Sequence, residues 1–253
     1  MKKILILLLS LSISLFGYTS VKKLKFESGI TIYGQIGFVD VVLIENFDNN
    51  TYEMKATTTS IGAVQYLTNN RRDIFTSEGQ IKDGVYIPFK FTKEAKKDDY
   101  HKITSYFFNY KEGTVNKTVS LEKYEDVSTF DPMTFSYKDE KKLIQEKSES
   151  TIKLYKNDYL SLYLNMKKGN LKIGQVFYVD KKDKDKLFYR NKDLVEVQKN
   201  HGEDKYNILV HHDEESIFFK KIESVGVSFY GDAYIEKVSE TTDIIEDKLV
   251  QLD

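Results

Sequence analysis

The densest group of side chains that could do chemistry is the stretch His211–His212–Asp213–Glu214–Glu215. Imidazole nitrogens and carboxylate oxygens are common zinc ligands. On a β-strand, however, neighbouring side chains point to opposite faces, so His211 and His212 would not reach one ion. His211 and Asp213 would share a face, but two ligands are fewer than a zinc site uses. We therefore interpret this stretch as a solvated turn, with a metal or acid–base site as the alternative.

Other signs of catalysis are sparse. His101 and His201 are isolated, and the chain contains no Cys. It also lacks a Gly-x-Ser-x-Gly elbow, a Walker phosphate loop and a dinucleotide-binding fingerprint. Most carboxylates lie in Lys-rich turns such as Lys181–Lys186, which read as solvated hairpin tips. We predict no catalytic residues, no metal site and no cofactor. A pair of acids that meet only in the folded chain stays open as an alternative.

Aromatic side chains offer a binding surface instead. The chain has 18 Tyr and 16 Phe, and several of them recur at the two-residue period of a strand face. A curled sheet that does not close leaves such faces around a hollow, where rings bury a ligand's tail and phenol groups orient its polar end. The alternative is that the rings pack into a dry core. The predicted lining residues are Tyr106, Phe108, Tyr110, Phe89, Phe91 and Phe177.

These residues belong to short β-branched and aromatic runs separated by turn residues, which is the pattern of an all-β sandwich or barrel. Turns are predicted at Asp48–Asn50, Lys97–Asp99, Glu112–Gly113 and Gly231–Asp232. Short turns between neighbouring runs favour antiparallel pairing, and a βαβ rhythm is absent. We predict an all-β, mainly antiparallel fold: a large open meander β-barrel or curved sandwich with one short helix.

The one predicted helix covers Asp158–Lys168. Asp158 is a good N-cap, and Gly169 suits the left-handed residue after the last turn. The polar stretch Asp139–Ser150 is expected to be a surface helix or a linker, and it is the only candidate boundary within residues 18–253, which otherwise form a single domain.

The N-terminus has the features of an export signal. Lys2 and Lys3 precede the uncharged apolar run Ile4–Phe16, which is shorter than the roughly 20 residues of a membrane span. We expect residues 1–17 to be a signal peptide, cleaved near Gly17. A retained anchor or a buried helix are the alternatives.

Charge argues against nucleic acid as a partner. The chain has 38 basic and 39 acidic side chains, and 36 against 39 without the signal's two lysines, a formal net charge of −3. Nucleic-acid binding by a general electrostatic grip needs a basic excess. The mature protein is expected in the periplasm or at the outer membrane, without being an integral membrane protein.

Several segments resemble the exported bacterial family named domain of unknown function 3108. They are Thr31–Gly37, Ser77–Gly79 with Tyr86–Phe89, Asn157–Tyr163 and Lys172–Gln175. The resemblance implies an envelope protein rich in antiparallel β-structure, built as a large open meander barrel. It implies no catalytic residues.

Three functions compete. The first, which we favour, is a non-enzymatic envelope protein that binds a lipid-like molecule, a glycan or a partner protein. The second is an envelope hydrolase that uses an acidic pair. The third is an integral outer-membrane barrel, which would need a continuous lipid-facing apolar band. Lysines within the predicted strands, such as Lys55, Lys90 and Lys172, oppose this third possibility.

Overall fold

The computed structural model describes residues 18–30, 33–165, 176–178, 192–198, 205–211, 213, 215–225 and 233–246. Its strands are β1 (Tyr18–Ile30), β2 (Gly34–Asn46), β3 (Thr51–Ser60), β4 (Arg72–Lys82), β5 (Val85–Lys97), β6 (Tyr100–Asn109), β7 (Thr114–Asp131), β8 (Ser136–Lys153), β9 (Val176–Tyr178), β10 (Lys192–Gln198), β11 (Lys205–His211), β12 (Lys221–Val225) and β13 (Ala233–Glu246). Two short helices are described, α2 (Gly62–Leu67) and α3 (Tyr159–Asn165). None of the described helices is long and apolar enough to cross a bilayer.

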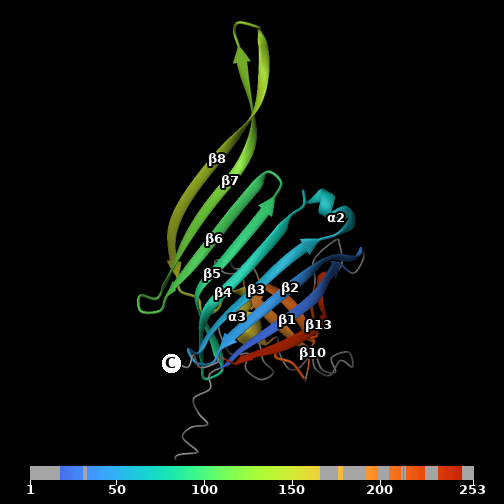
Figure 1. The fold of residues 1–253 in the computed structure, drawn as a ribbon, viewed down its shortest axis with the longest axis vertical. Helices are drawn as coiled ribbons and strands as arrows, with labels where there is room; N and C mark the ends of the chain where they lie inside the picture. Colours follow the sequence, from blue (N-terminus) through green and yellow to red (C-terminus); the bar gives the residue numbers. More distant parts are fainter. Residues whose placement is uncertain are drawn as a thin grey trace, which may run out of the picture.

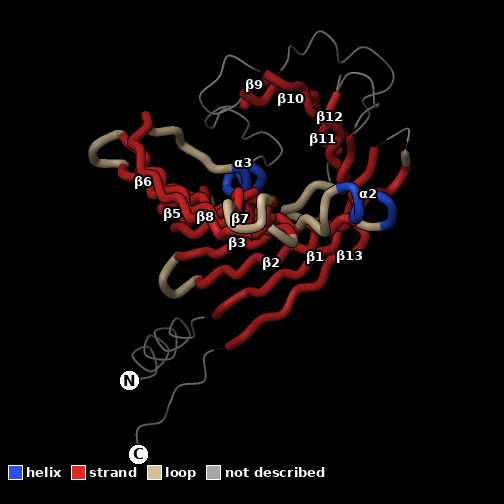
Figure 2. The backbone as a smooth tube through the Cα atoms, turned by 90° about the horizontal axis from the view of Figure 1, so that it is seen from above, coloured by secondary structure: helices blue, strands red, loops and turns tan. Residues whose placement is uncertain are grey.

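All thirteen described strands belong to one sheet in the order β8-β7-β6-β5-β4-β3-β2-β1-β13-β12-β11-β10-β9. Neighbouring strands in the sheet are also neighbours in the chain, except where β1 pairs antiparallel with β13. The sheet therefore starts and ends at β8 and β9 and is open between them. Figure 2 shows it curving around α3, with β9–β12 on the far side of the helix from β1–β6. The predicted all-β, mainly antiparallel, open meander is confirmed.

The turns have the chemistry that hairpins require. Asp83 and Gly84, with φ of 52° and 75°, form the two-residue loop between β4 and β5, the positive-φ pair typical of a type I′ hairpin. Asn50 and Gly113 also have positive φ, at 50° and 67°. The predicted turns at Asp48–Asn50 and Glu112–Gly113 separate strands, and that at Lys97–Asp99 begins at the last residue of β5. Gly231–Asp232 lies outside the described residues.

Strand alternation places one apolar face on the inside of the curve. Leu24 and Phe26 of β1, Val41 and Leu43 of β2, and Tyr52, Met54 and Ala56 of β3 are buried and belong to one core cluster. Leu160 and Leu164 of α3 belong to the same cluster. The concave face of the sheet and the helix that lies on it thus form the hydrophobic core.

Two local expectations are wrong. Asp139–Ser150 is neither a helix nor a linker, because it lies within β8, which pairs with β7 without a break from Thr114–Lys153 to Asp131–Ser136. The aromatic run Phe130–Tyr137 predicts a strand of its own, but it contains the turn between β7 and β8. Helix α2 was not expected at all, so the fold has more than one short helix.

The β7–β8 hairpin extends well beyond the rest of the sheet (Figure 1). The outermost residue pair between β6 and β7 joins Tyr100 to Lys123. Beyond Lys123, β7 pairs only with β8 among the described strands. Its tip exposes Met133 and Phe135, and the Phe130 ring contacts those of Phe135 and Tyr137. The core of the protein lies at the other end of these strands.

A β-bulge separates two rings that a simple alternation would place together. Phe89 and Phe91 are expected on one face, but Glu78 pairs with Lys90 while Gly79 pairs with Pro88, so Phe89 falls in the bulge. Phe89 is 47% exposed, whereas Phe91 is 2% exposed. A Cβ on Gly79 would lie 2.2 Å from the Ile87 carbonyl oxygen, so this close backbone approach requires glycine.

We expect Phe108→Ala to cost about 3–5 kcal/mol of unfolding free energy, because Phe108 belongs to the buried core cluster and packs on Tyr155 with ring centroids 5.2 Å apart. Phe89→Ala is the matched control and should change stability by about 0.5 kcal/mol or less, as exposed substitutions do. Urea unfolding followed by circular dichroism measures both. Equal losses would contradict the placement of the two rings.

Candidate functional site: an apolar cavity under α3

Helix α3 is fixed to the concave face by a buried carboxylate. Asp158 is 2% exposed, and its Oδ1 accepts hydrogen bonds from the backbone N–H groups of Leu160 at 2.8 Å and Ser161 at 2.9 Å. The Ser161 hydroxyl in turn accepts from the Asp158 N–H at 2.9 Å. Asp158 is thus the N-cap that its position before an apolar run predicts, and this part of the helix prediction is confirmed. Residues 166–168 lie outside the described residues.

The same carboxylate ties the helix to the sheet. The hydroxyl of Ser77 on β4 donates to Oδ2 of Asp158 at 2.7 Å. The Tyr52 hydroxyl lies 2.9 Å from the Ser77 hydroxyl and donates to it, because the Ser77 proton is already used. Burial raises the pKa of Asp158 above its ordinary value, although the hydrogen bonds to the carboxylate oppose this shift.

The other end of α3 is held by an amide. Oδ1 of Asn165 accepts from the Tyr86 N–H at 2.9 Å, while its Nδ2 donates to the Tyr86 carbonyl at 2.8 Å and to Oδ1 of Asn157 at 2.8 Å. The Asn165 amide therefore hydrogen-bonds to both backbone polar groups of Tyr86 on β5, as the backbone of a neighbouring strand would. Both ends of this short helix are anchored, which compensates for the weak stability of so few turns.

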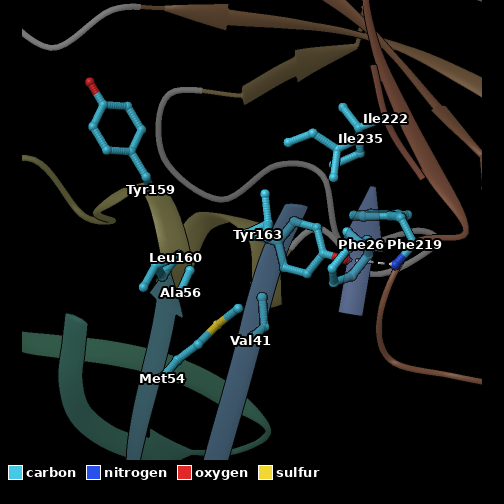
Figure 3. A pocket seen from close by; sticks show the side chains of 11 residues that line it. Phe26, Val41, Met54, Ala56, Tyr159, Leu160, Tyr163, Phe219, Ile222 and Ile235 are labelled. Atoms are coloured by element: carbon cyan, nitrogen blue, oxygen red, sulfur yellow. Dashed lines mark hydrogen bonds between the residues drawn. The ribbon is translucent and has the colours of Figure 1, made fainter. Parts of the chain in front are cut away.

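Between the helix and the sheet lies an apolar cavity of about 140 Å³ (Figure 3). Its floor comes from β1–β3, one side from α3, and the opposite side from β12, β13 and the segment before β12. Among the described lining residues no side chain is charged, and only Tyr159 and Tyr163 contribute hydroxyls. The lining residues are Phe26, Val39, Val41, Met54, Ala56, Tyr159, Leu160, Tyr163, Phe219, Ile222 and Ile235.

Tyr163 and Phe219 join the two sides of this cavity. The Tyr163 hydroxyl accepts a hydrogen bond from the Phe219 N–H at 3.1 Å, drawn as a dashed line in Figure 3. The Tyr163 ring also packs on Phe218 and Phe219, with centroids 5.9 and 5.4 Å apart. The apolar and aromatic residues of Ser216–Glu223 predict a strand, but β12 begins only at Lys221. The preceding residues instead bring these two rings against α3.

The cavity's composition determines what it can hold. A buried water needs two to four polar partners, and a cavity of about 150 Å³ lined by apolar side chains stays dry and binds benzene. The cavity under α3 has nearly this volume and almost no polar lining atoms. It therefore suits a small apolar molecule or part of a hydrocarbon chain.

The predicted lining residues lie elsewhere on the sheet. Phe91 is buried and contacts the Tyr159 ring, while Tyr106 is half-buried beside it on β6. Phe108 and Tyr110 stack at 6.2 Å and border an open hollow at the end of β6. Phe89 is exposed in its bulge, and the side chain of Phe177 lies outside the described residues. None of the five described side chains, those of Tyr106, Phe108, Tyr110, Phe89 and Phe91, lines the cavity under α3.

His211 and Asp213, in the stretch predicted to be a solvated turn, are engaged in ion pairs. His211 hydrogen-bonds with Glu223 at 2.7 Å, and Lys237 donates to Asp213 at 2.6 Å. The hydrogen bond from Lys237 lowers the pKa of Asp213. His212 and Glu214 lie outside the described residues. Within the described part of the chain, no three His, Cys, Asp or Glu side chains are arranged to hold a metal.

No protein-family model matches the chain, and no curated protein is significantly similar to it. The resemblance to domain of unknown function 3108 therefore stays a prediction.

The raised pKa of Asp158 gives stability a definite pH dependence. Between the ordinary carboxyl pKa and the higher folded value, the folded chain holds a proton that the unfolded chain has lost. The unfolding free energy should therefore fall as pH rises through this window. Asp158→Asn, whose side chain can keep the N-cap, should lack this fall, whereas Asp158→Ala should lose about 1–3 kcal/mol throughout.

Urea unfolding of the wild type and both variants from pH 4 to pH 8 measures this difference. Subtracting the Asp158→Asn curve removes the contributions of the other carboxyl groups. A wild type whose stability runs parallel to that of Asp158→Asn would contradict the assignment.

Proposed function

We propose that this protein is a non-enzymatic binding protein of the bacterial cell envelope whose ligand places a hydrocarbon group in the cavity under α3. The observation that carries the proposal is the cavity itself, about 140 Å³ lined by apolar side chains from the sheet, the helix and the segment before β12. An evolved core of ordinary packing density contains few voids larger than a water molecule. A bound hydrocarbon group would fill this volume, which supports a binding role.

The buried carboxylates support binding over hydrolysis. Glu45 accepts from the Tyr86 hydroxyl at 2.5 Å and pairs with Lys22, while Asp158 caps α3. Each has a structural task, and neither lines the cavity. An acid-pair hydrolase would instead direct two carboxyl groups into a shared pocket. A glycan ligand is also less favoured, because sugar hydroxyls need polar partners that this lining lacks.

A series of linear alcohols tests the proposal. Each methylene that enters the cavity contributes about 0.8 kcal/mol, so affinity should rise about fourfold per carbon and then level off once the cavity is full. Isothermal titration calorimetry from butanol to dodecanol measures the slope and the plateau.

Ala56→Leu is the test variant, because Ala56 lines the cavity and the added carbons would occupy it. Thr57→Leu is the matched control, since Thr57 follows Ala56 on the same strand and points to the opposite face. Ala56→Leu should lose alcohol binding while staying folded, and Thr57→Leu should keep it. Chain-length-independent binding, or equal binding by both variants, would contradict the proposal.

Export is the second part of the proposal, and the apolar run Ile4–Phe16 behind Lys2 and Lys3 supports it. N-terminal sequencing of protein from an envelope fraction should give a first residue at or within a few residues after Gly17. A cytoplasmic protein that still begins at Met1 would overturn this part.

A further inference from the structure

A second hollow, of about 250 Å³, lies on the same concave face but has the opposite chemistry. It is lined by Arg71, which directly precedes β4, and by residues of β5, β6 and β7. Three of its lining residues are lysines on adjacent strands: Lys93 on β5, Lys102 on β6 and Lys117 on β7. The remaining lining residues are Arg71, Ala95, Tyr100, Thr104 and Tyr106.

The sheet register explains why the lysines converge. Lys93 pairs with Thr104, and Tyr106 pairs with Lys117. Lys102 pairs with the buried Ala95, so it belongs to the same face. Lysines on three neighbouring strands thus point to one side of the sheet, where the pleat places them around Thr104 and Tyr106.

The three lysines have no carboxylate partner among the described residues, in contrast to Arg71 and Lys123. Arg71 is bound by Asp73 in a bidentate pair at 2.8 and 3.0 Å, and Lys123 is paired with Glu125 at 2.5 Å. Lys93 instead lies over the Phe75 ring and Lys117 over the Tyr106 ring, at 5.5 and 5.9 Å from the ring centroids. A chain with a formal net charge of −1 therefore gathers three half-buried lysines without a described carboxylate partner in one hollow.

Aromatic rings connect this hollow to the cavity under α3. Tyr159, which lines the cavity, contacts Phe91 with centroids 5.9 Å apart, and Phe91 contacts Tyr106 at 5.8 Å. Tyr106 lines the hollow. Two ring contacts therefore separate an apolar cavity from a cationic hollow on the concave face. This arrangement is complementary to an amphiphile, which has a hydrocarbon chain and an anionic head.

We infer that Lys93, Lys102 and Lys117 bind the phosphate-class head group of an amphiphile whose hydrocarbon chain occupies the cavity under α3. This inference rests on the proposed function for the chain and adds the chemistry of the head. Lysine ammonium groups bind phosphate as point charges. The Tyr100 and Tyr106 phenols and the Thr104 hydroxyl line the same hollow and supply neutral donors.

Calorimetry with three probes separates the head from the chain: dodecanol, dodecyl phosphate and inorganic phosphate. In the wild type, dodecyl phosphate should bind at least tenfold more tightly than dodecanol, and this gain should shrink as salt is raised because the charges are only half-buried. Inorganic phosphate alone should bind far more weakly than dodecyl phosphate.

The test variant is the triple substitution Lys93→Gln, Lys102→Gln and Lys117→Gln. The matched control carries Lys55→Gln, Lys82→Gln and Lys96→Gln, which change the net charge equally at exposed positions on β3, β4 and β5. The test variant should bind dodecyl phosphate no more tightly than dodecanol and should keep wild-type affinity for dodecanol. The control should keep the phosphate gain.

The outcomes distinguish this inference from the proposed function. Normal dodecanol binding without a gain from the phosphate, or a gain that survives in the test variant, would overturn the head-group site and leave the cavity proposal standing. Inorganic phosphate that binds as tightly as dodecyl phosphate, in a protein that ignores dodecanol, would overturn the amphiphile and indicate a site for free phosphate.

Discussion

The arrangement of the concave face depends on one buried carboxylate, that of Asp158. It satisfies two N–H groups at the start of α3 and accepts a hydrogen bond from Ser77 on β4. A helix of seven residues has little stability of its own. Its position on the sheet is therefore set by this anchor and by Asn165 at its other end. The cavity exists only because the helix is held at this distance, since it forms one of the cavity's sides.

The open sheet provides the second constraint. Because β8 and β9 are the ends of the strand order, the sheet curves without closing, and its concave face is covered by α3 and by Phe218 and Phe219. Around the cavity under α3 this face is apolar, whereas along β5–β7 it carries Lys93, Lys102 and Lys117. One curved surface thus presents a place for a hydrocarbon chain next to a place for an anion. The proposed binding function and the proposed head-group site both follow from this gradient.

Much of the fold could be predicted from the sequence, because hairpin turns and strand alternation are local signals. Asp158 was recognisable as an N-cap for the same reason. Asp139–Ser150 was misread since its Lys and Glu residues suit a helix, and only the pairing with β7 makes it a strand. The displacement of Phe89 depends on the close approach of Gly79 to Ile87 across the bulge. The cavity could not be predicted from the sequence for a related reason. It combines β1–β3, α3 and β13, and the β1–β13 pairing brings the two ends of the chain together. No sequence pattern identifies the cationic hollow, because only the strand register brings Lys93, Lys102 and Lys117 together.

The central claim is that the protein carries a single amphiphile on its concave face, and native mass spectrometry of the protein purified from its own cells tests it most directly. The account predicts a population heavier than the polypeptide by the mass of one small amphiphile, which organic solvent extracts and whose fragments include phosphate. It predicts that Ala56→Leu, purified in the same way, shows the polypeptide mass alone. A wild type found only at its polypeptide mass, or an adduct equally abundant in Ala56→Leu, would contradict it.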